Sequence, residues 1–342
     1  MSEITYPREI YAGPWTTGHC QGIAVDKAQG YIYFSFTTVL VKMDFSGRVI
    51  GTVKGLTGHL GCIDFCEADG RVWGSLEYKD DEIGRGVLRR AGLTGKITNA
   101  FYVAIFDVEK IDRVGMDACT DGVMTTVYMH EVMRDFSARV EDGGRTVDHR
   151  HGCSGMDGTT FGRLPGDPDG PYRLLIGYGI YGDVARGDND DQVILAYDVS
   201  DWAKYEQPLS QQNMHTCGPD KPDGKYFVRT GNTRWGVQNL EYDEATGHLL
   251  MAVYKGQKPA FPNWPLFAID GGRAPEGNRL TLLDPGCGGE TPGWDYPWGA
   301  TGLCSLGDGL FYVSQDGREG DAFHTRAVLC RWDGVTPLVP MA

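Results

Sequence analysis

Three carboxylates, Asp64, Asp157 and Glu241, stand at matching places in three copies of a recurring apolar segment of this 342-residue chain. Two carboxyl groups that face the same sugar can serve as general acid and as nucleophile or base in glycoside hydrolysis. We therefore take these three acids as candidate catalytic residues. The structural alternative stays open: each acid could accept hydrogen bonds from backbone N–H groups of a neighbouring strand.

Three histidines form a second set of candidates. His19 and His59 occupy equivalent positions in two copies of the segment, and His151 is displaced by one residue in a third copy. Neutral imidazoles on adjacent strands, with Gln21 or Gln238 nearby, could bind a first-row divalent metal ion. Such an ion would acidify a C–H bond of a sugar, as a lyase requires. Alternatively, these histidines only hydrogen-bond the nearby backbone.

Acid–base chemistry without a metal is a third possibility. A histidine could work with a tyrosine, while Arg234 or Lys255 neutralises the carboxylate of a uronic acid. Aromatic and planar polar side chains also suit the apolar faces and hydroxyl edges of a sugar. The full set of candidate substrate-binding residues is His19, Gln21, His59, His151, Tyr178, Asn232, Arg234, Trp235, Gln238, Lys255 and Trp298. The alternative for the tryptophans is that they only fill a channel.

These candidates can meet only if the elements that carry them surround a common axis. A strand–turn–strand unit recurs five times, at residues 18–36, 58–76, 151–176, 235–254 and 298–313. Radial repetition of such units predicts a β-propeller. The inner strands would then begin, and the second strands end, at one mouth of the ring. The long loops 79–99, 182–191, 256–264 and 316–326 are expected to open at this mouth.

We expect five four-stranded blades in a single domain over residues 1–342. The last blade is one strand short, so segment 9–15 is predicted to supply its outer strand and close the ring, which removes two free sheet edges. A six-bladed ring with a further blade in 100–150 is the competing prediction. A short helix is expected near 108–114. The predicted strands are 21–26, 31–36, 39–44, 49–53, 61–65, 72–78, 101–107, 124–131, 154–161, 172–178, 192–198, 225–230, 238–242, 249–255, 266–270, 280–283, 301–306, 310–315 and 327–333.

The order Asp, Asp, Glu on three successive inner strands resembles the acid pattern of five-bladed furanosidase-type glycoside hydrolases. The resemblance covers this inner-strand pattern only. It implies that Asp64 is the nucleophile or base, that Asp157 orients the sugar or tunes a pKa, and that Glu241 protonates the leaving oxygen.

Composition narrows the classes of partner. The formal net charge of −14 argues against nucleic acid and anionic membranes. The N-terminus lacks the apolar core of a signal peptide, so we expect a cytoplasmic protein. Nine cysteines without paired spacing predict buried, reduced thiols. No phosphate-binding glycine loop and no Gly-x-Ser-x-Gly motif supports an NAD, ATP or serine-hydrolase function.

The sequence therefore predicts a carbohydrate-active enzyme with a small-molecule carbohydrate as its partner. Glycoside hydrolysis, which requires no cofactor, is the first reaction expected. The alternatives are a lyase or sugar isomerase that uses a divalent metal or a His/Tyr pair, and a non-catalytic binding or scaffold propeller. The oligomeric state is not predicted.

Overall fold

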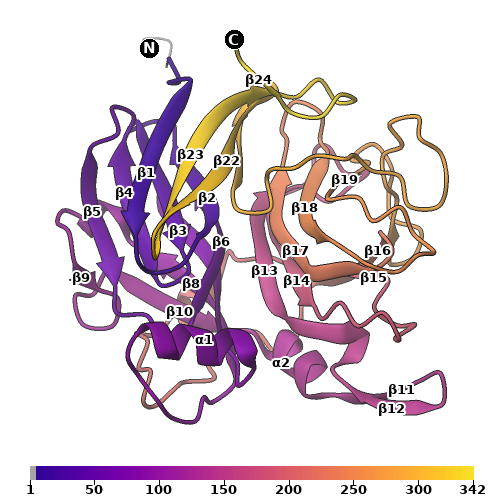
Figure 1. Cartoon of the computed structure of the whole chain (residues 1–342), viewed down its shortest axis with the longest axis horizontal. Coiled ribbons are helices and arrows are strands. Elements are labelled where there is room, and N and C mark those ends of the chain that lie inside the picture. Colours follow the sequence, from indigo (N-terminus) through magenta and orange to yellow (C-terminus); the bar gives the residue numbers. More distant parts are fainter. Residues whose placement is uncertain (1–4) are drawn as a thin grey trace.

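The structure, a computed structural model, describes residues 5–342 and contains five sheets arranged as blades around a common axis (Figure 1). The protein is an all-β, five-bladed β-propeller, as the repeats predict. Glycines allow the inner strands of neighbouring blades to approach each other closely. A Cβ atom on Gly22 of the first blade would lie 2.7 Å from the backbone nitrogen of Ile63 in the second.

The first two blades follow the predicted strands closely. The first contains β2 (Cys20–Asp26), β3 (Tyr31–Phe36), β4 (Val39–Asp44) and β5 (Val49–Lys54), with the short β9 (Met116–Asp117) paired in parallel to β5. The second contains β6 (His59–Cys66), β7 (Arg71–Tyr78), β8 (Ala100–Phe106) and β10 (Met124–Tyr128). Segment 100–150 holds no sixth blade, because β8 and β10 belong to this second sheet.

One short edge strand belongs to the third blade and not, as predicted, to the fourth. The third contains β13 (Cys153–Gly162), β14 (Arg173–Ile180), β15 (Asp191–Tyr197), β16 (Gly224–Arg229) and β20 (Arg279–Leu280). The fourth contains β17 (Thr233–Tyr242), β18 (Leu249–Lys255) and β19 (Leu266–Ile269). The predicted fourth strand at 280–283 is therefore corrected: Leu280 pairs in the third blade, and Leu282 makes only an isolated bridge to Ile269.

The N-terminal strand closes the ring, as predicted. The fifth blade has the order β1 (Glu9–Trp15), β23 (Ala322–Arg331), β22 (Leu310–Glu319) and β21 (Leu303–Gly307), and β24 (Val339–Pro340) also pairs with β23. Figure 1 shows the two ends of the colour scale, indigo β1 and yellow β23, side by side. Residues 316–326 form the end of a long hairpin rather than a loop.

Two α-helices occupy segments that read as loops in the sequence. Helix α1 (Glu82–Arg90) follows β7, and α2 (His130–Ser137) follows β10 and precedes the hairpin of β11 (Arg139–Asp142) and β12 (Arg145–Asp148). The expected helix near 108–114 is only the single 3-10 turn Val108–Lys110, and two further turns are Arg150–Gly152 and Trp202–Lys204. In the described part of the chain, no helix has the length and apolarity needed to cross a bilayer.

The core lies between the blades, where the β-branched and aromatic side chains of the strands pack face to face. All nine cysteines are free thiols, and six of them are buried in this core, as expected.

Candidate active site

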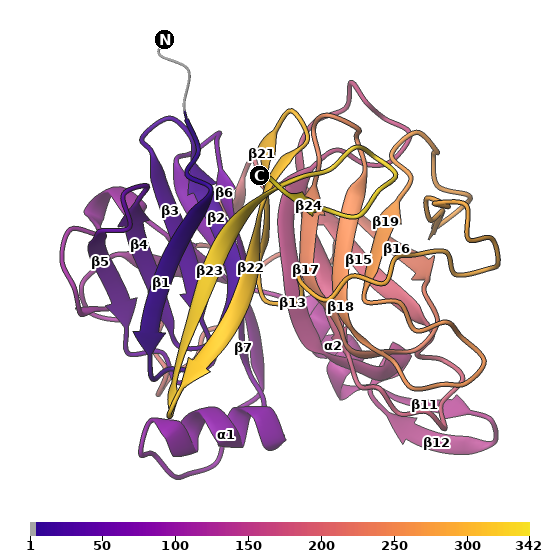
Figure 2. The same cartoon turned by 45° about the horizontal axis from the view of Figure 1, so that its top comes forward.

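A cavity of about 440 Å3 opens at one mouth of the ring. Its walls come from the beginnings of inner strands and the ends of second strands, and α1 lies across this end of the ring (Figure 2). Of the residues predicted from the sequence, seven line this cavity: His19, Gln21, His59, Asp157, Arg234, Trp235 and Gln238. Tyr254, Glu77 and Lys79 also reach it.

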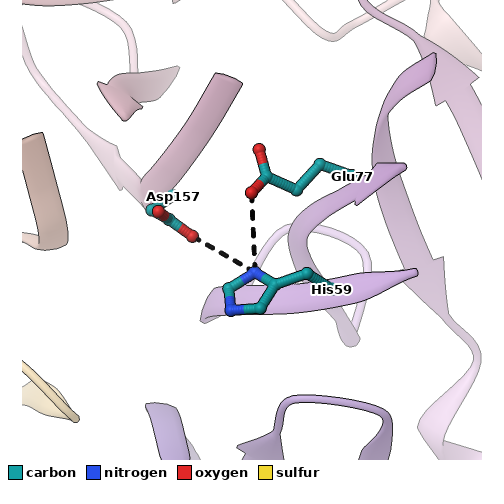
Figure 3. A group of neighbouring side chains, drawn as sticks. All are labelled: His59, Glu77 and Asp157. Carbon is teal, nitrogen blue, oxygen red and sulfur yellow. Dashed lines mark ion pairs between the residues drawn. The ribbon is translucent and has the colours of Figure 1, made fainter. Parts of the chain in front are cut away.

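The floor of the cavity holds one imidazole between two carboxylates (Figure 3). Nδ1 of His59 lies 3.7 Å from Oε1 of Glu77 and 3.5 Å from Oδ1 of Asp157. All three atoms are buried, and Nδ1 of His59 and Oδ1 of Asp157 have no hydrogen-bond partner. Lys79 supplies a nearby cation, because its Nζ lies 2.5 Å from Oε1 of Glu77. Buried polar atoms are normally paired, so two unpaired atoms that converge on one point beside the Glu77 carboxylate indicate a site for a ligand.

Burial controls the protonation of the floor. Desolvation, followed by the charge of Lys79, lowers the pKa of His59 to about 3, so the imidazole is neutral. Burial and then the negative charge of Glu77 raise the pKa of Asp157 well above its ordinary value. The floor therefore contains an imidazole that stays neutral and a carboxyl group that tends to keep its proton.

A bulge at the same place in four of the five inner strands turns one residue toward the mouth. The pairing register shifts at Gln21 in β2, at Gly61 in β6, at Asp157 in β13 and at Gln238 in β17. Bulges re-aim side chains beside functional sites. Asp157 is thus the third-blade equivalent of Gln21 and Gln238, a position that the sequence alignment gave to Ser154.

Glu77 reaches the floor through a gap left by a glycine. A Cβ atom on Gly155, which has φ +126, would lie 2.0 Å from Oε2 of Glu77. The backbone N–H of Met156 donates to this same oxygen over 3.1 Å. Gly155 therefore leaves the space that the Glu77 carboxylate occupies. Its backbone conformation also lets the next N–H group, that of Met156, point at this carboxylate.

Three arginines surround the opening. Arg89 and Arg90 come from the last turn of α1, and Arg234 comes from β17, where its guanidinium lies 5.7 Å from the Trp235 ring. Within residues 5–342, none of these three guanidiniums forms an ion pair. By contrast, Arg85 on the same helix is paired with Asp80 over 2.9 Å. A strongly acidic protein thus has a local concentration of unpaired positive charge at this mouth.

Helix α1 forms here because its ends are well capped. The side chain of Asp81 accepts a hydrogen bond from the N–H of Gly84 over 2.9 Å, and Glu82 lies in the first turn. Arg89 and Arg90 lie in the last turn, where positive charge complements the helix dipole. The same two residues thus stabilise the helix and line the cavity.

The predicted group of three acids is corrected, because Asp64 and Glu241 do not face the cavity that contains Asp157. They lie toward the other end of their strands and line a second cavity of about 330 Å3. Asp64 accepts from the N–H of Phe161 over 2.7 Å, and Glu241 accepts from the N–H of Ser305 over 2.7 Å. Both acids therefore cap the inner strand of the next blade, the alternative considered from the sequence.

The predicted cluster of three histidines does not form. The ring of His151 lies 5.0 Å from that of Phe227, and the backbone N–H of His151 donates to Asp188. His19 does line the cavity, but its nearest side-chain partner is Gln21, at 3.2 Å from Nε2. His59 faces two carboxylates instead of another histidine.

Four other predicted binding residues lie outside this cavity. The hydroxyl of Tyr178 is buried and donates to Asp135 over 2.9 Å, and Lys255 pairs with Asp295 over 2.5 Å. Asn232 and Trp298 line two smaller neighbouring cavities.

The candidate set from the sequence lacked five charged residues that line the site: Glu77, Lys79, Glu82, Arg89 and Arg90. The alternation of Glu77 and Lys79 at the end of a strand was a usable signal, because residues two apart point to the same face. The two arginines gave no such signal, since the helix that carries them was not expected.

Comparison with known proteins shows no family model that matches the chain, and no curated protein matches its sequence. Among solved structures, a soluble aldose sugar dehydrogenase from Escherichia coli in the apo form aligns over 95% of this chain and 100% of its own, with 9% identity and a TM-score of 0.39. A gluconolactonase from Xanthomonas campestris aligns over 90% of this chain and 72% of its own, with 10% identity and a TM-score of 0.37. A β-propeller domain from Myceliophteria thermophila aligns over 93% and 100%, with 10% identity and a TM-score of 0.34. Similarity at this level bears on neither substrate nor chemistry.

Proposed function

We propose that the protein is a carbohydrate-active enzyme that binds a small acidic sugar in the mouth cavity and acts on it by proton transfer, as a lyase or sugar isomerase. The observation that carries this proposal is the composition of a single cavity. Three unpaired guanidiniums surround its opening, and buried proton-exchanging groups form its floor.

The rim supports an anionic substrate. Among residues 5–342, no carboxylate pairs with Arg89, Arg90 or Arg234. A carboxylate or phosphate on the substrate could therefore form ion pairs with their guanidiniums. Trp235 and Tyr254 offer aromatic surface, while Gln21 and Gln238 offer amide donors and acceptors. This mixture suits a sugar, which has apolar C–H faces and a hydroxyl edge.

The floor supports proton transfer. Neutralising a sugar carboxylate with arginines makes the adjacent C–H bond more acidic. The carboxylate of Glu77, whose pKa burial raises, can then take the proton, and Asp157 can return one. Return to a neighbouring carbon gives an isomerase, and loss of a β-oxygen with that proton gives a lyase.

Glycoside hydrolysis stays as the second candidate, at the second cavity. Asp64 and Glu241 both line it, and Oε2 of Glu241 is buried without a partner. Burial raises the pKa of Asp64 to about 6, and burial together with Asp64 raises that of Glu241. A carboxyl pair with one member protonated is the arrangement that hydrolysis requires.

The test is a panel of neutral sugars, uronic acids, aldonic acids and sugar phosphates, screened for thermal stabilisation and for turnover. We expect acidic sugars to bind and neutral ones not to. Arg234→Ala should raise the dissociation constant by about 10-fold or more, since a hydrogen bond to a charged group contributes about 1.5–3 kcal/mol. Arg85→Ala is the matched control, because Arg85 lies on α1 but is already paired with Asp80.

Two comparisons separate the candidate reactions. Asp157→Asn should reduce turnover of an acidic sugar by at least about 100-fold, the usual contribution of a general acid or base. If Glu241→Gln abolishes turnover and Asp157→Asn does not, the reaction belongs to the second cavity. If no member of the panel binds at the mouth, the proposed function is wrong.

A further inference from the structure

The geometry points to a divalent transition-metal site formed by Nδ1 of His59, Oε1 of Glu77 and Oδ1 of Asp157. This inference rests on the proposed function in taking the mouth cavity as the active site. With an ion bound at these atoms, a water at its open coordination position would exchange the proton in place of the ligand side chains. The three side chains come from three strands of two blades, β6, β7 and β13, and converge on one point (Figure 3).

The distances between the three atoms fit ligands of one ion. They all lie within 4.8 Å of one another, and the imidazole nitrogen is 3.5 Å and 3.7 Å from the two oxygens. These separations are too long for hydrogen bonds. Two ligands that each lie about 2.0–2.2 Å from an ion are themselves about 3–3.5 Å apart, so a small closure would complete the site.

The unpaired atoms give independent support. Asp157 is 6% exposed, yet its Oδ1 has no hydrogen-bond partner, and Nδ1 of His59 beside it has none either. Glu77 is 2% exposed, and its Oε1, which faces the same point, is paired with Nζ of Lys79. The other oxygen of each carboxylate is held: the N–H of Met156 donates to Oε2 of Glu77, and Gln238 donates to Oδ2 of Asp157 over 3.3 Å. Hydrogen bonds on the outer oxygens orient metal-binding carboxylates in this way.

The donor set indicates the class of ion. One imidazole and two carboxylates suit Mn²⁺, Fe²⁺, Co²⁺ or Zn²⁺ better than Mg²⁺ or Ca²⁺, which prefer oxygen ligands alone. Three protein ligands leave at least one coordination position, and the cavity lies beside it. Catalytic metal sites keep such a position for water or substrate, whereas structural sites are closed.

Lys79 is the natural competitor for this site. Its Nζ lies 2.5 Å from Oε1 of Glu77 and 3.9 Å from Oδ2 of Asp81. A divalent ion at Oε1 would push the ammonium toward Asp81, which can receive it. Glu77, Asp157 and Asp81 carry three potential negative charges against the single charge of Lys79, so a divalent ion would bring the cluster to neutrality.

The test measures metal directly and needs no substrate. Protein stripped with a chelator is titrated with Zn²⁺ and Mn²⁺ by calorimetry, and its metal content is measured after dialysis. We expect about one ion per chain, with affinity reduced at least about 10-fold in Glu77→Gln and in Asp157→Asn. Asp64→Asn and Glu241→Gln are matched controls, since they make the same changes in inner-strand acids outside the cluster, and they should retain the ion.

A spectroscopic experiment keeps the test decisive if the carboxylate variants misfold. Co²⁺ bound to wild-type protein should give visible absorption bands that shift in His59→Gln, because a nitrogen ligand is lost. Absence of stoichiometric binding by the wild type, or unchanged affinity in Asp157→Asn with unchanged bands in His59→Gln, would overturn the site. If the wild-type protein binds an acidic sugar but no metal ion, only this inference is refuted. If it binds a metal ion but no acidic sugar, only the proposed function is refuted.

Discussion

Gly61 leaves the space that the carboxylate of Asp157 occupies. A Cβ atom on Gly61 of β6 would lie only 2.6 Å from Oδ1 of Asp157, which comes from the next blade. Both residues lie at the inner-strand bulge of their blades. The position of the Asp157 carboxylate therefore depends on a missing side chain in the neighbouring strand as well as on its own backbone.

Gly61→Ala should displace Asp157 and damage the floor of the cavity. We expect binding of Zn²⁺ or Mn²⁺ to weaken by about 10-fold or more, with a loss of stability of about 1–3 kcal/mol from overpacking. Gly162→Ala is the control: its Cβ would lie 2.6 Å from the side chain of Tyr242, at the other end of β13. Calorimetry and urea unfolding of both variants check the prediction, and equal metal affinity in the two would contradict it.

The blade framework was predictable because it follows from local patterns. Each repeat joins a buried strand, a turn and an aromatic-rich strand, and the missing last strand pointed correctly to segment 9–15. Bulges, by contrast, depend on how two strands pair, so the sequence alignment placed Ser154 where Asp157 belongs. This error of three residues also explains why His151, which the alignment placed one residue from the position of His59, lies before the start of β13.

The rest of the site depended on elements without a clear pattern. Segment 79–99 is rich in charge and glycine, so it reads as a loop, yet the Asp81 cap begins a helix there. Tyr178 was expected at the mouth, but it is next to the residue that pairs with Gly155, and alternation along β14 turns it into the core.

Lys79→Met should tighten metal binding, an effect opposite in sign to that of the ligand variants. Removing the ammonium from Oε1 of Glu77 removes the competing cation, so we expect the dissociation constant for Mn²⁺ to fall by about 10-fold. Lys255→Met serves as the control, since Lys255 pairs with Asp295 outside the cavity. Weaker Mn²⁺ binding in Lys79→Met, measured by calorimetry, would show that Lys79 supports the site.

Asp316 should make stability depend on pH. Burial raises its pKa from 3.8 to about 7, so the folded state binds more protons than the unfolded state between these values. The contribution of Asp316 to stability is therefore greatest below about pH 4 and is lost as the pH rises to about 7. The free energy of unfolding of Asp316→Asn, relative to that of the wild type, should therefore increase by roughly 2–4 kcal/mol as the pH rises over this range. Urea unfolding at a series of pH values measures the difference, and a constant difference would refute the prediction.

Closure of the ring by β1 should contribute strongly to stability. Ile10 is 2% exposed and packs between the first and fifth blades. Ile10→Ala should cost about 2–5 kcal/mol in the free energy of unfolding, the usual loss for a large buried aliphatic side chain. The neighbouring Glu9→Ala removes only an exposed ion pair with Arg326 and should cost less than about 1 kcal/mol. Equal losses in urea unfolding would mean that β1 is not an integral strand.

The central claim is that an acidic sugar binds at the mouth between the arginines and the His59, Glu77 and Asp157 floor. A crystal structure of the protein soaked with the tightest-binding acidic sugar of the panel tests it most directly. The account predicts the acidic group of the sugar within hydrogen-bond distance of Arg234 or of Arg89 and Arg90, with the sugar ring above Asp157. Density for the sugar beside Asp64 and Glu241, with none at the mouth, would contradict it.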